Sequence, residues 1–123
     1  MKWVIDHSHT LYCITYTLSD EATISIGALG VFTFPPGLYC YIGSAKKNIQ
    51  KRIERHLAIE KKLRWHIDYF RPYCDIANVQ TFPEHEGECA LAEKYAQLGQ
   101  RFPKQFGSSD CKCGGHLIFL KRI

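Results

Sequence analysis

The chain has 123 residues, a length that suits one domain, spanning residues 1–123, with a hydrophobic core of its own. Hydrophobic residues make up 46% of it, yet no stretch is long and apolar enough for a membrane helix, and the first residues lack the apolar run of a signal peptide. The sequence therefore argues against a membrane helix and predicts a cytoplasmic protein.

The positive charge is concentrated in one stretch of the chain. Residues 46 to 64 contain eight Lys/Arg and two Glu, a local net charge of +6, whereas the whole chain carries only +4. A basic stripe on an otherwise nearly neutral protein is typical of a nucleic-acid-binding surface. A solvated helix face with charges balanced four residues apart would have the same composition, so charge alone leaves both interpretations open.

The six cysteines, at positions 13, 40, 74, 89, 111 and 113, are expected to be reduced thiols. Several lie in apolar, strand-like segments, and no secretory signal accompanies them. Cys111, Cys113 and His116 could bind a metal, but two thiols separated by one residue do not have the usual spacing of a structural zinc site. A tight loop with packed thiols is the alternative interpretation.

The first third of the chain has the pattern of four strands. Runs of β-branched and aromatic residues, separated by Asp20-Glu21, by glycines and by Pro35-Pro36-Gly37, predict an antiparallel meander. The predicted strands are Thr10–Leu18, Ala22–Ile26, Val31–Phe34 and Leu38–Ile42. Tyr39 and Tyr41 are two residues apart on the last strand and therefore point to the same face.

Helices and strands alternate in the rest of the chain. Asn48 suits a helix N-cap, and Ile49, Ile53 and Leu57 recur at helical spacing, which predicts a helix over Asn48–Ile59. The other predicted elements are helices at Lys61–Phe70 and Gly87–Leu98 and strands at Ile76–Phe82 and His116–Leu120. The whole pattern predicts an α+β domain with a small mixed, largely antiparallel sheet flanked by helices.

Several motifs, in this order, resemble those of a known family. Tyr41-Ile42-Gly43, followed by Ser44-Ala45 and a helix that carries Arg52, resembles the GIY-YIG nuclease superfamily. Members of that superfamily have a small sheet flanked by helices, and they cleave phosphodiesters with a tyrosine, a helix arginine and a glutamate that holds a divalent metal. A set of four segments resembles, more narrowly, an uncharacterised branch whose members are sometimes attached to a DNA-repair endonuclease: Gly37–Ala45, Arg55-His56-Leu57, Trp65-His66-Ile67-Asp68 and Phe106-Gly107-Ser108-Ser109-Asp110-Cys111.

The resemblance implies roles for particular residues. Tyr41 and Gly43 match the second tripeptide of the superfamily, and Arg52 matches its helix arginine. Thr10-Leu11-Tyr12 stands where the first tripeptide is expected, so Tyr12 is the candidate first tyrosine. The long gap between the two tyrosines then implies that residues 22 to 34 form an inserted pair of strands.

The metal-holding glutamate is open between Glu88 and Glu93. These two reproduce the paired glutamates, five apart, of excision-repair relatives, in which the second one is the ligand. Helix geometry favours Glu88, because it lies amid the apolar face of Leu91, Ala92 and Tyr95, whereas Glu93 lies about 140° away. A carboxylate on a face that packs against the protein is expected to be paired or to hold a metal, and one carboxylate suits Mg²⁺ or Mn²⁺.

The candidate catalytic residues are Tyr12, Tyr41, Arg52, His56 and Glu88. A tyrosine has a pKa of about 10, so either one could act as a base only where nearby cations favour its phenolate. Arg52 and the metal would provide that positive charge and would stabilise charge on the phosphate. His56 lies one turn beyond Arg52 and could relay a proton or contact phosphate.

The predicted partner is DNA, with RNA as an alternative, and a DNA-repair protein is a further expected partner. The residues expected to bind nucleic acid are Gly43, Ser44, Lys46, Lys47, Arg55, Lys61, Lys62, Arg64 and His66. On the predicted helix His66 and Asp68 diverge, and we expect Asp68 to pair with Arg64 four residues earlier.

Three functions are compatible with these patterns. The first is a metal-dependent endonuclease that hydrolyses phosphodiester bonds in DNA, with a place in repair. The second is a catalytically inactive nucleic-acid-binding module of the same fold, which the departure of Thr10-Leu11-Tyr12 from the usual tripeptide favours. The third is a protein centred on a metal or thiols in the Cys111–His116 loop.

Overall fold

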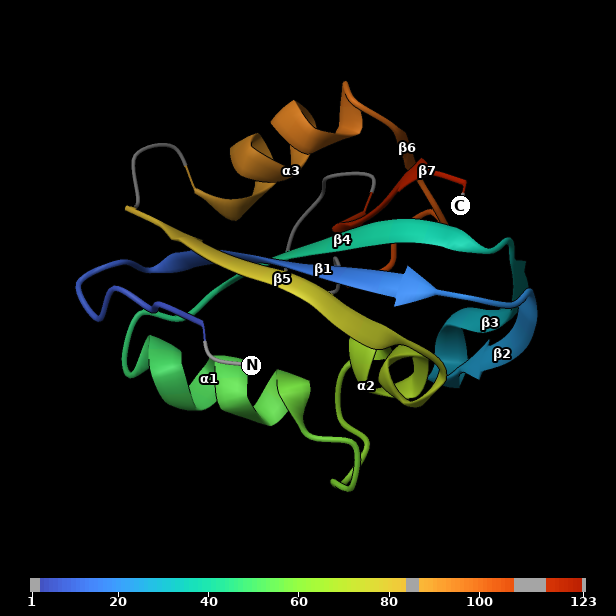
Figure 1. The fold of residues 1–123 in the computed structure, drawn as a ribbon, viewed down its shortest axis with the longest axis horizontal. Helices are drawn as coiled ribbons and strands as arrows, with labels where there is room; N and C mark the ends of the chain where they lie inside the picture. The colour runs from blue at the N-terminus through green and yellow to red at the C-terminus, as the bar shows by residue number, and fades with distance from the viewer. Residues whose placement is uncertain (1–2, 84–86, 108–114, 123) are drawn as a thin grey trace.

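A five-stranded sheet forms the centre of the domain (Figure 1), with the strand order β5-β1-β4-β7-β6. The computed structural model describes residues 3–83, 87–107 and 115–122. Every strand pairing in those residues is antiparallel. The strands of this sheet are β1 Leu11–Leu18, β4 Gly37–Ser44, β5 Asp75–Phe82, β6 Gln100–Arg101 and β7 Leu117–Lys121. The predicted α+β fold is confirmed.

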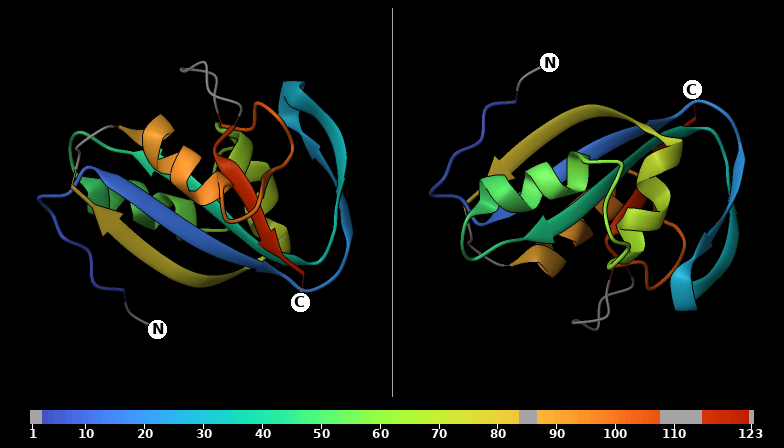
Figure 2. Two further views of the ribbon diagram at one scale, coloured as in Figure 1. Left: turned by 90° about the horizontal axis from the view of Figure 1, so that it is seen from above. Right: turned by 90° about the horizontal axis from the view of Figure 1, so that it is seen from below.

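The first four strands do not form the predicted meander. β1 pairs directly with β4 over its whole length, from Leu11 opposite Ser44 to Leu18 opposite Gly37. The intervening strands β2 (Ala22–Ile26) and β3 (Gly30–Phe34), joined by a 3₁₀ turn at Gly27–Leu29, form a separate two-stranded sheet, as the inserted pair of strands implied. This hairpin buries Ile24, Ile26 and Phe34 at one end of the domain, beside α2 (Figures 1 and 2).

The helices cover both faces of the central sheet. Helices α1 (Ile49–Leu57) and α2 (His66–Phe70) lie on one face, and α3 (Glu88–Ala96) lies on the other (Figures 1 and 2). The tyrosines of β1 and β4 point toward α1 and α2, whereas Cys13, Cys40 and Ile42 pack with Ala92 of α3. The alternation of side chains along β1 and β4 thus supplies two hydrophobic layers.

Two helix predictions need correction or refinement. α1 begins as predicted, with the Asn48 side chain accepting the backbone N–H of Lys51 at 3.3 Å. The predicted helix Lys61–Phe70 is wrong over residues 61–65, because α2 begins only at His66 and a 3₁₀ turn, Arg71–Tyr73, follows it. The short strand β6 was not predicted at all. It pairs with β7, and a strand of two residues is too short to give a periodic signal in the sequence.

The described part of the chain has no helix that is both long and apolar enough to cross a membrane. Cys13, Cys40 and Cys74 are free thiols, as predicted. Cys111 and Cys113 lie outside the described residues, and so does the Ser108-Ser109-Asp110 segment.

Candidate active site

A pocket of about 170 Å³ opens beside the end of β4. Its walls come from β1, β4, α1, α3, the start of α2 and the segments that precede α2 and β7. The residues that line it are Tyr12, Tyr41, Gly43, Ser44, Arg52, His56, Arg64, Trp65, His66, Glu88, Gly107 and His116. All five candidate catalytic residues are in this set, so the fold brings together side chains that lie as far as 76 positions apart in the sequence.

Strand register explains the glycine of the Tyr-Ile-Gly motif. Tyr12 on β1 lies directly opposite Gly43 on β4, and opposed residues in an antiparallel pair share one face. A Cβ atom at position 43 would clash with the ring and hydroxyl of Tyr12. Glycine therefore lets the Tyr12 ring lie across β4, while Tyr41, opposite Ile14, reaches the pocket from the same face.

Tyr12 and His56 form a buried polar pair across the sheet–helix interface. The Tyr12 hydroxyl and His56 Nε2 are 2.7 Å apart, and the two side chains are only 2% and 1% exposed. Burial raises the pKa of Tyr12 above that of an ordinary phenol, and the charge of Arg52 offsets this only in part. Burial, reinforced by the charge of Lys61, lowers the pKa of His56 to about 3. Both groups are therefore neutral at pH 7.

Arg52 is held at the pocket by the backbone of β4 and by an aromatic ring. Its Nη1 donates a hydrogen bond to the Ser44 carbonyl oxygen at 3.1 Å. Its guanidinium lies 4.8 Å from the ring centre of Trp65, which also has the guanidiniums of Arg55 and Arg64 at 4.5 and 5.5 Å. Such cation–π contacts orient guanidiniums while leaving polar edges exposed. Trp65 was missed as a site residue, although it directly follows the basic stretch and precedes His66.

Glu88 enters the pocket from the opposite helix layer. Its Oε1 accepts a hydrogen bond from the Ser44 hydroxyl at 3.1 Å, and its Oε2 lies 3.3 Å from His116 Nδ1. Burial alone would raise the pKa of Glu88, but the contacts with His116 and Ser44 and the charge of Arg52 outweigh it and lower the pKa. Glu88 is therefore ionised at neutral pH.

Glu93 lies outside the pocket. Its side chain is 59% exposed and pairs with Arg101 Nη2 at 3.6 Å. Helix geometry separated the two glutamates in the same way, with one on the packed face and the other turned toward solvent.

The donor set around Glu88 fits a hard cation that keeps much of its water shell. Among residues 3–83, 87–107 and 115–122, no group of three or more His, Cys, Asp or Glu side chains could hold a metal ion by itself. Mg²⁺ is commonly bound through one or two carboxylates together with waters and substrate oxygens. A single ionised carboxylate in a polar pocket suits that mode of binding.

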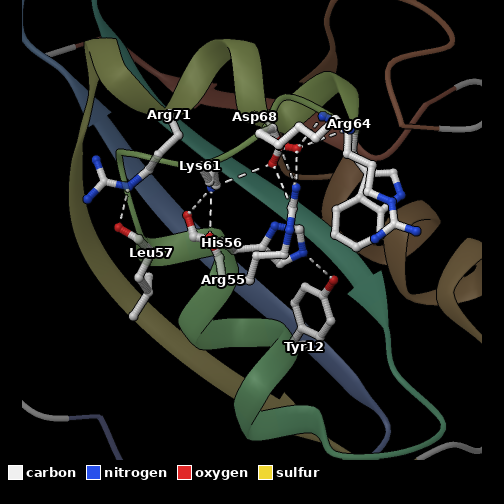
Figure 3. A network of polar contacts seen from close by, with 10 residues as sticks. Tyr12, Arg55, His56, Leu57, Lys61, Arg64, Asp68 and Arg71 are labelled. Carbon is white, nitrogen blue, oxygen red and sulfur yellow. Dashed lines mark hydrogen bonds and ion pairs between the residues drawn. The ribbon is translucent and has the colours of Figure 1, made fainter.

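Asp68 is the centre of a buried polar network behind the pocket (Figure 3). Its carboxylate is fully buried and accepts hydrogen bonds from Arg55 Nη1 and Nη2 at 3.1 and 2.9 Å. The backbone N–H groups of Arg64 and Trp65 each donate to it at 2.9 Å, and Lys61 Nζ lies 3.5 Å away. The predicted side-chain pair of Arg64 and Asp68 is wrong, because residues 61–65 are not helical and the Arg64 guanidinium stacks on Trp65 instead.

Two of the cations predicted to bind nucleic acid, Arg55 and Lys61, instead pair with Asp68 within the protein. Lys61, whose side chain is only 7% exposed, donates to the carbonyl oxygens of Arg55 and His56 at 2.8 and 3.1 Å. Arg71 donates from Nε to the Leu57 carbonyl at 3.0 Å, so cations satisfy the last carbonyls of α1. Arg55 is committed in the same way, through its two hydrogen bonds to Asp68.

The remaining predicted cations stay on the surface. Lys46 and Lys47 are exposed shortly after Ser44, and Lys62 and Arg64 are exposed in the segment that precedes Trp65, where Arg64 also lines the pocket.

His116 and Gly107 are two further pocket residues that the sequence did not indicate as site residues. His116 is 2% exposed, and its Nε2 lies 3.7 Å from Cys89 Sγ while its Nδ1 faces Glu88. Gly107 has a positive φ of 73°, and a Cβ atom at this position would lie 2.9 Å from Tyr41 Cε1. His116 was considered only as a partner of Cys111 and Cys113, whose predicted metal-binding role falls outside the described residues.

Comparison with known proteins gives a family match over nearly the whole chain. A family model, described as a domain of unknown function, DUF123, matches residues 11–123. No curated protein and no solved structure matches the chain.

Proposed function

The chain belongs to the family of the domain of unknown function DUF123, and we propose that it is a metal-dependent endonuclease that hydrolyses phosphodiester bonds in DNA. This proposal rests on one observation, that the candidate catalytic residues meet in one pocket. Tyr12, Tyr41, Arg52, His56 and Glu88 come from four separate elements and line one pocket. The two tyrosines, Arg52 and Glu88 are the residue types that the resemblance to the GIY-YIG nucleases requires, and the resemblance also motivates a cytoplasmic role in repair beside a partner repair protein.

Arg52 is the group that binds the scissile phosphate. A guanidinium is always charged at physiological pH and matches the geometry of phosphate oxygens. The Ser44 carbonyl and the Trp65 ring hold it in place before substrate arrives, so little reorganisation is needed when negative charge develops.

The proton of the attacking water passes to Tyr12 and His56. At neutral pH Tyr12 carries its hydroxyl proton and His56 is neutral, so His56 Nε2 can accept the phenolic proton while Tyr12 takes one from water. A bound phosphodiester adds negative charge to the pocket and raises the pKa of His56 from its low resting value. Tyr41, whose pKa burial also raises, stays protonated and borders the same space.

Glu88 is the residue that would hold Mg²⁺ or Mn²⁺. When bound, such an ion supplies charge neutralisation and polarisation of a phosphoryl oxygen. Ser44 and His116 fix the two carboxylate oxygens of Glu88, and this contact keeps the carboxylate ionised and directed at the pocket.

The exposed cations give the pocket a surface suited to a polyanion. Lys46 and Lys47 follow Ser44 in the chain, and Lys62 and Arg64 precede Trp65, all within the stretch of local net charge +6. Binding through such contacts should weaken steeply with added salt, because each neutralised phosphate releases counterions.

Cleavage of supercoiled plasmid and of branched and single-stranded DNA in Mg²⁺ or Mn²⁺ tests the proposal. Glu88→Gln should lower the cleavage rate by about 100-fold or more, since it removes the charge that holds the metal. Glu93→Gln, on the same helix but outside the pocket, is the matched control and should leave the rate unchanged. Equal cleavage by the wild type and Glu88→Gln would overturn the assignment.

A second candidate is a nucleic-acid-binding module that keeps the fold without cleavage. It is favoured by Thr10-Leu11-Tyr12 in place of the usual first tripeptide and by the deep burial of Tyr12. Salt-sensitive binding of DNA or RNA, with no cleavage in either metal, would select this function over the first.

A further inference from the structure

His66 is the first residue of α2, and one of its ring nitrogens has a fixed role. The backbone N–H of Gly107 donates a hydrogen bond to His66 Nδ1 at 2.9 Å. A backbone amide nitrogen can only donate, so Nδ1 must be the unprotonated, accepting nitrogen. A neutral imidazole carries one proton, and in His66 that proton is therefore on Nε2.

The protonated nitrogen of His66 is available to the pocket. His66 lines the pocket with Tyr12, Arg52 and Glu88. Its Nε2 has no hydrogen-bond partner among the described residues, and it is not among the buried unpaired atoms. The ring of Phe106, centred 5.6 Å away in an edge-to-face arrangement, restricts how far the imidazole can turn.

Gly107 can donate this hydrogen bond to His66 because it is a glycine. Its φ of 73° lies in the left-handed region, which residues other than glycine rarely adopt. A Cβ atom at this position would also lie 2.9 Å from Tyr41 Cε1, closer than carbon atoms pack. With no side chain at position 107, the backbone amide can donate to His66 without a clash against the Tyr41 ring.

The same hydrogen bond opposes protonation of His66. An imidazolium has a proton on both nitrogens, so its Nδ1–H would face the Gly107 N–H with no acceptor between them. Burial acts in the same direction and lowers the pKa of His66. The charged groups that line the same pocket are Arg64, on the segment before α2, Arg52, from α1, and Glu88, from α3. The other titratable groups that line the pocket are Tyr12, Tyr41, His56 and His116.

We propose that His66 is a catalytic residue that acts as a neutral donor, with its tautomer locked by Gly107, and gives its Nε2–H to a non-bridging oxygen of a bound phosphodiester. This inference rests on the proposed function, because the phosphodiester is that of the nucleic-acid substrate. A neutral imidazole N–H is too weak an acid to release its proton at neutral pH, so His66 stabilises charge and does not protonate the leaving group. The sequence indicated only that His66 contacts nucleic acid, and the Gly107 contact defines how.

Nitrogen-15 NMR of the histidine side chains tests the lock without any cleavage assay. His66 should show the Nε2–H neutral tautomer and should titrate below the ordinary histidine pKa of about 6.5. Addition of a short DNA duplex without divalent metal should shift the Nε2 and Hε2 resonances and leave Nδ1 accepting. An Nδ1–H tautomer, an ordinary titration, or resonances unmoved by saturating DNA would each overturn the proposal.

A pair of variants separates donation from a structural role. His66→Gln keeps an amide N–H near the position of Nε2, whereas His66→Ala removes the donor. His66→Ala should lose about 100-fold in kcat with KM little changed, and His66→Gln should recover at least tenfold of that loss. Equal loss in both variants, with unchanged thermal unfolding, would contradict the donor role. If the wild type cleaves no DNA, the NMR experiment still decides the inference, so its failure and that of the nuclease proposal remain distinct.

Discussion

Asp68→Asn is expected to destabilise the domain more than any other single neutralisation of an acidic residue in the described chain. The substitution preserves the shape of a fully buried side chain and removes the charge that faces Arg55 and Lys61. Removal of one partner from a buried ion pair costs about 3–5 kcal/mol. The Arg55 side chain is 25% exposed and can regain some hydration, so we expect the lower end, about 3 kcal/mol. A domain of this size has only about 5–15 kcal/mol of stability in total.

Urea unfolding at pH 7, followed by circular dichroism, measures this loss. The midpoint should fall with the slope unchanged, and the melting temperature should drop by about 12 °C. Asp75→Asn, an exposed acidic residue on β5, is the control and should change stability by less than about 0.5 kcal/mol. A loss in Asp68→Asn no larger than that of the control would show that the carboxylate does not hold α1 to the segment before α2.

The pH dependence of this loss has a defined sign. Burial opposes ionisation of Asp68, but the hydrogen bonds from Arg55 and from the Trp65 and Arg64 backbone, with the charge of Lys61, lower its pKa. A lowered pKa gives stability that is present above the ordinary carboxyl pKa of about 3.9 and is lost as the pH falls through the lower folded value. The gap between wild type and Asp68→Asn should therefore be full at pH 7 and should close in acid below about pH 4.

Two further predictions concern His56, which pairs with Tyr12, and Gly43, which lies opposite Tyr12. Because the pKa of His56 falls to about 3 in the folded protein, the unfolding free energy should decrease by about 1.4 kcal/mol per pH unit below about pH 6.5, and His56→Gln should lose this slope. Wild-type stability that stays flat between about pH 6 and pH 4 would contradict the low pKa. Gly43→Ala should cost about 1–3 kcal/mol and slow cleavage, because the new methyl group displaces the Tyr12 ring. Its cost should shrink in a Tyr12→Ala background, and strict additivity of the two changes would argue against the clash.

Local patterns predicted most elements of this fold but not which strands pair. The Asn48 cap and the apolar spacing of Ile49, Ile53 and Leu57 place the start of α1 within one residue. The meander failed because strand composition carries no information on which neighbour a strand selects. The long gap between Tyr12 and Tyr41 did indicate the pairing, because an inserted hairpin is needed if the strands of these two tyrosines are to be adjacent.

The sequence predicted site residues whose placement follows from local helical spacing. It did not predict residues whose role depends on contacts with distant segments. Glu88 could be separated from Glu93 by helical periodicity, a local property. Trp65 was missed for another reason: α2 begins only at His66, where Asp68 accepts hydrogen bonds from the backbone of residues 64 and 65, and Trp65 therefore lies in the non-helical segment before it. The role of Gly107 depends on a tertiary hydrogen bond to His66, for which the sequence has no signal.

The buried carboxylate also changes the meaning of the basic stretch. A count of charge treats the eight Lys/Arg between positions 46 and 64 as one surface. The structure divides them, because Arg55 and Lys61 are bound to Asp68 and to the end of α1, and Arg52 is held against Trp65 inside the pocket. The charge committed to Asp68 orients α1, which carries Arg52 and His56, and outside the pocket only the exposed remainder is left to contact phosphates. The salt dependence of DNA binding should therefore reflect fewer ionic contacts than the charge of the stretch suggests.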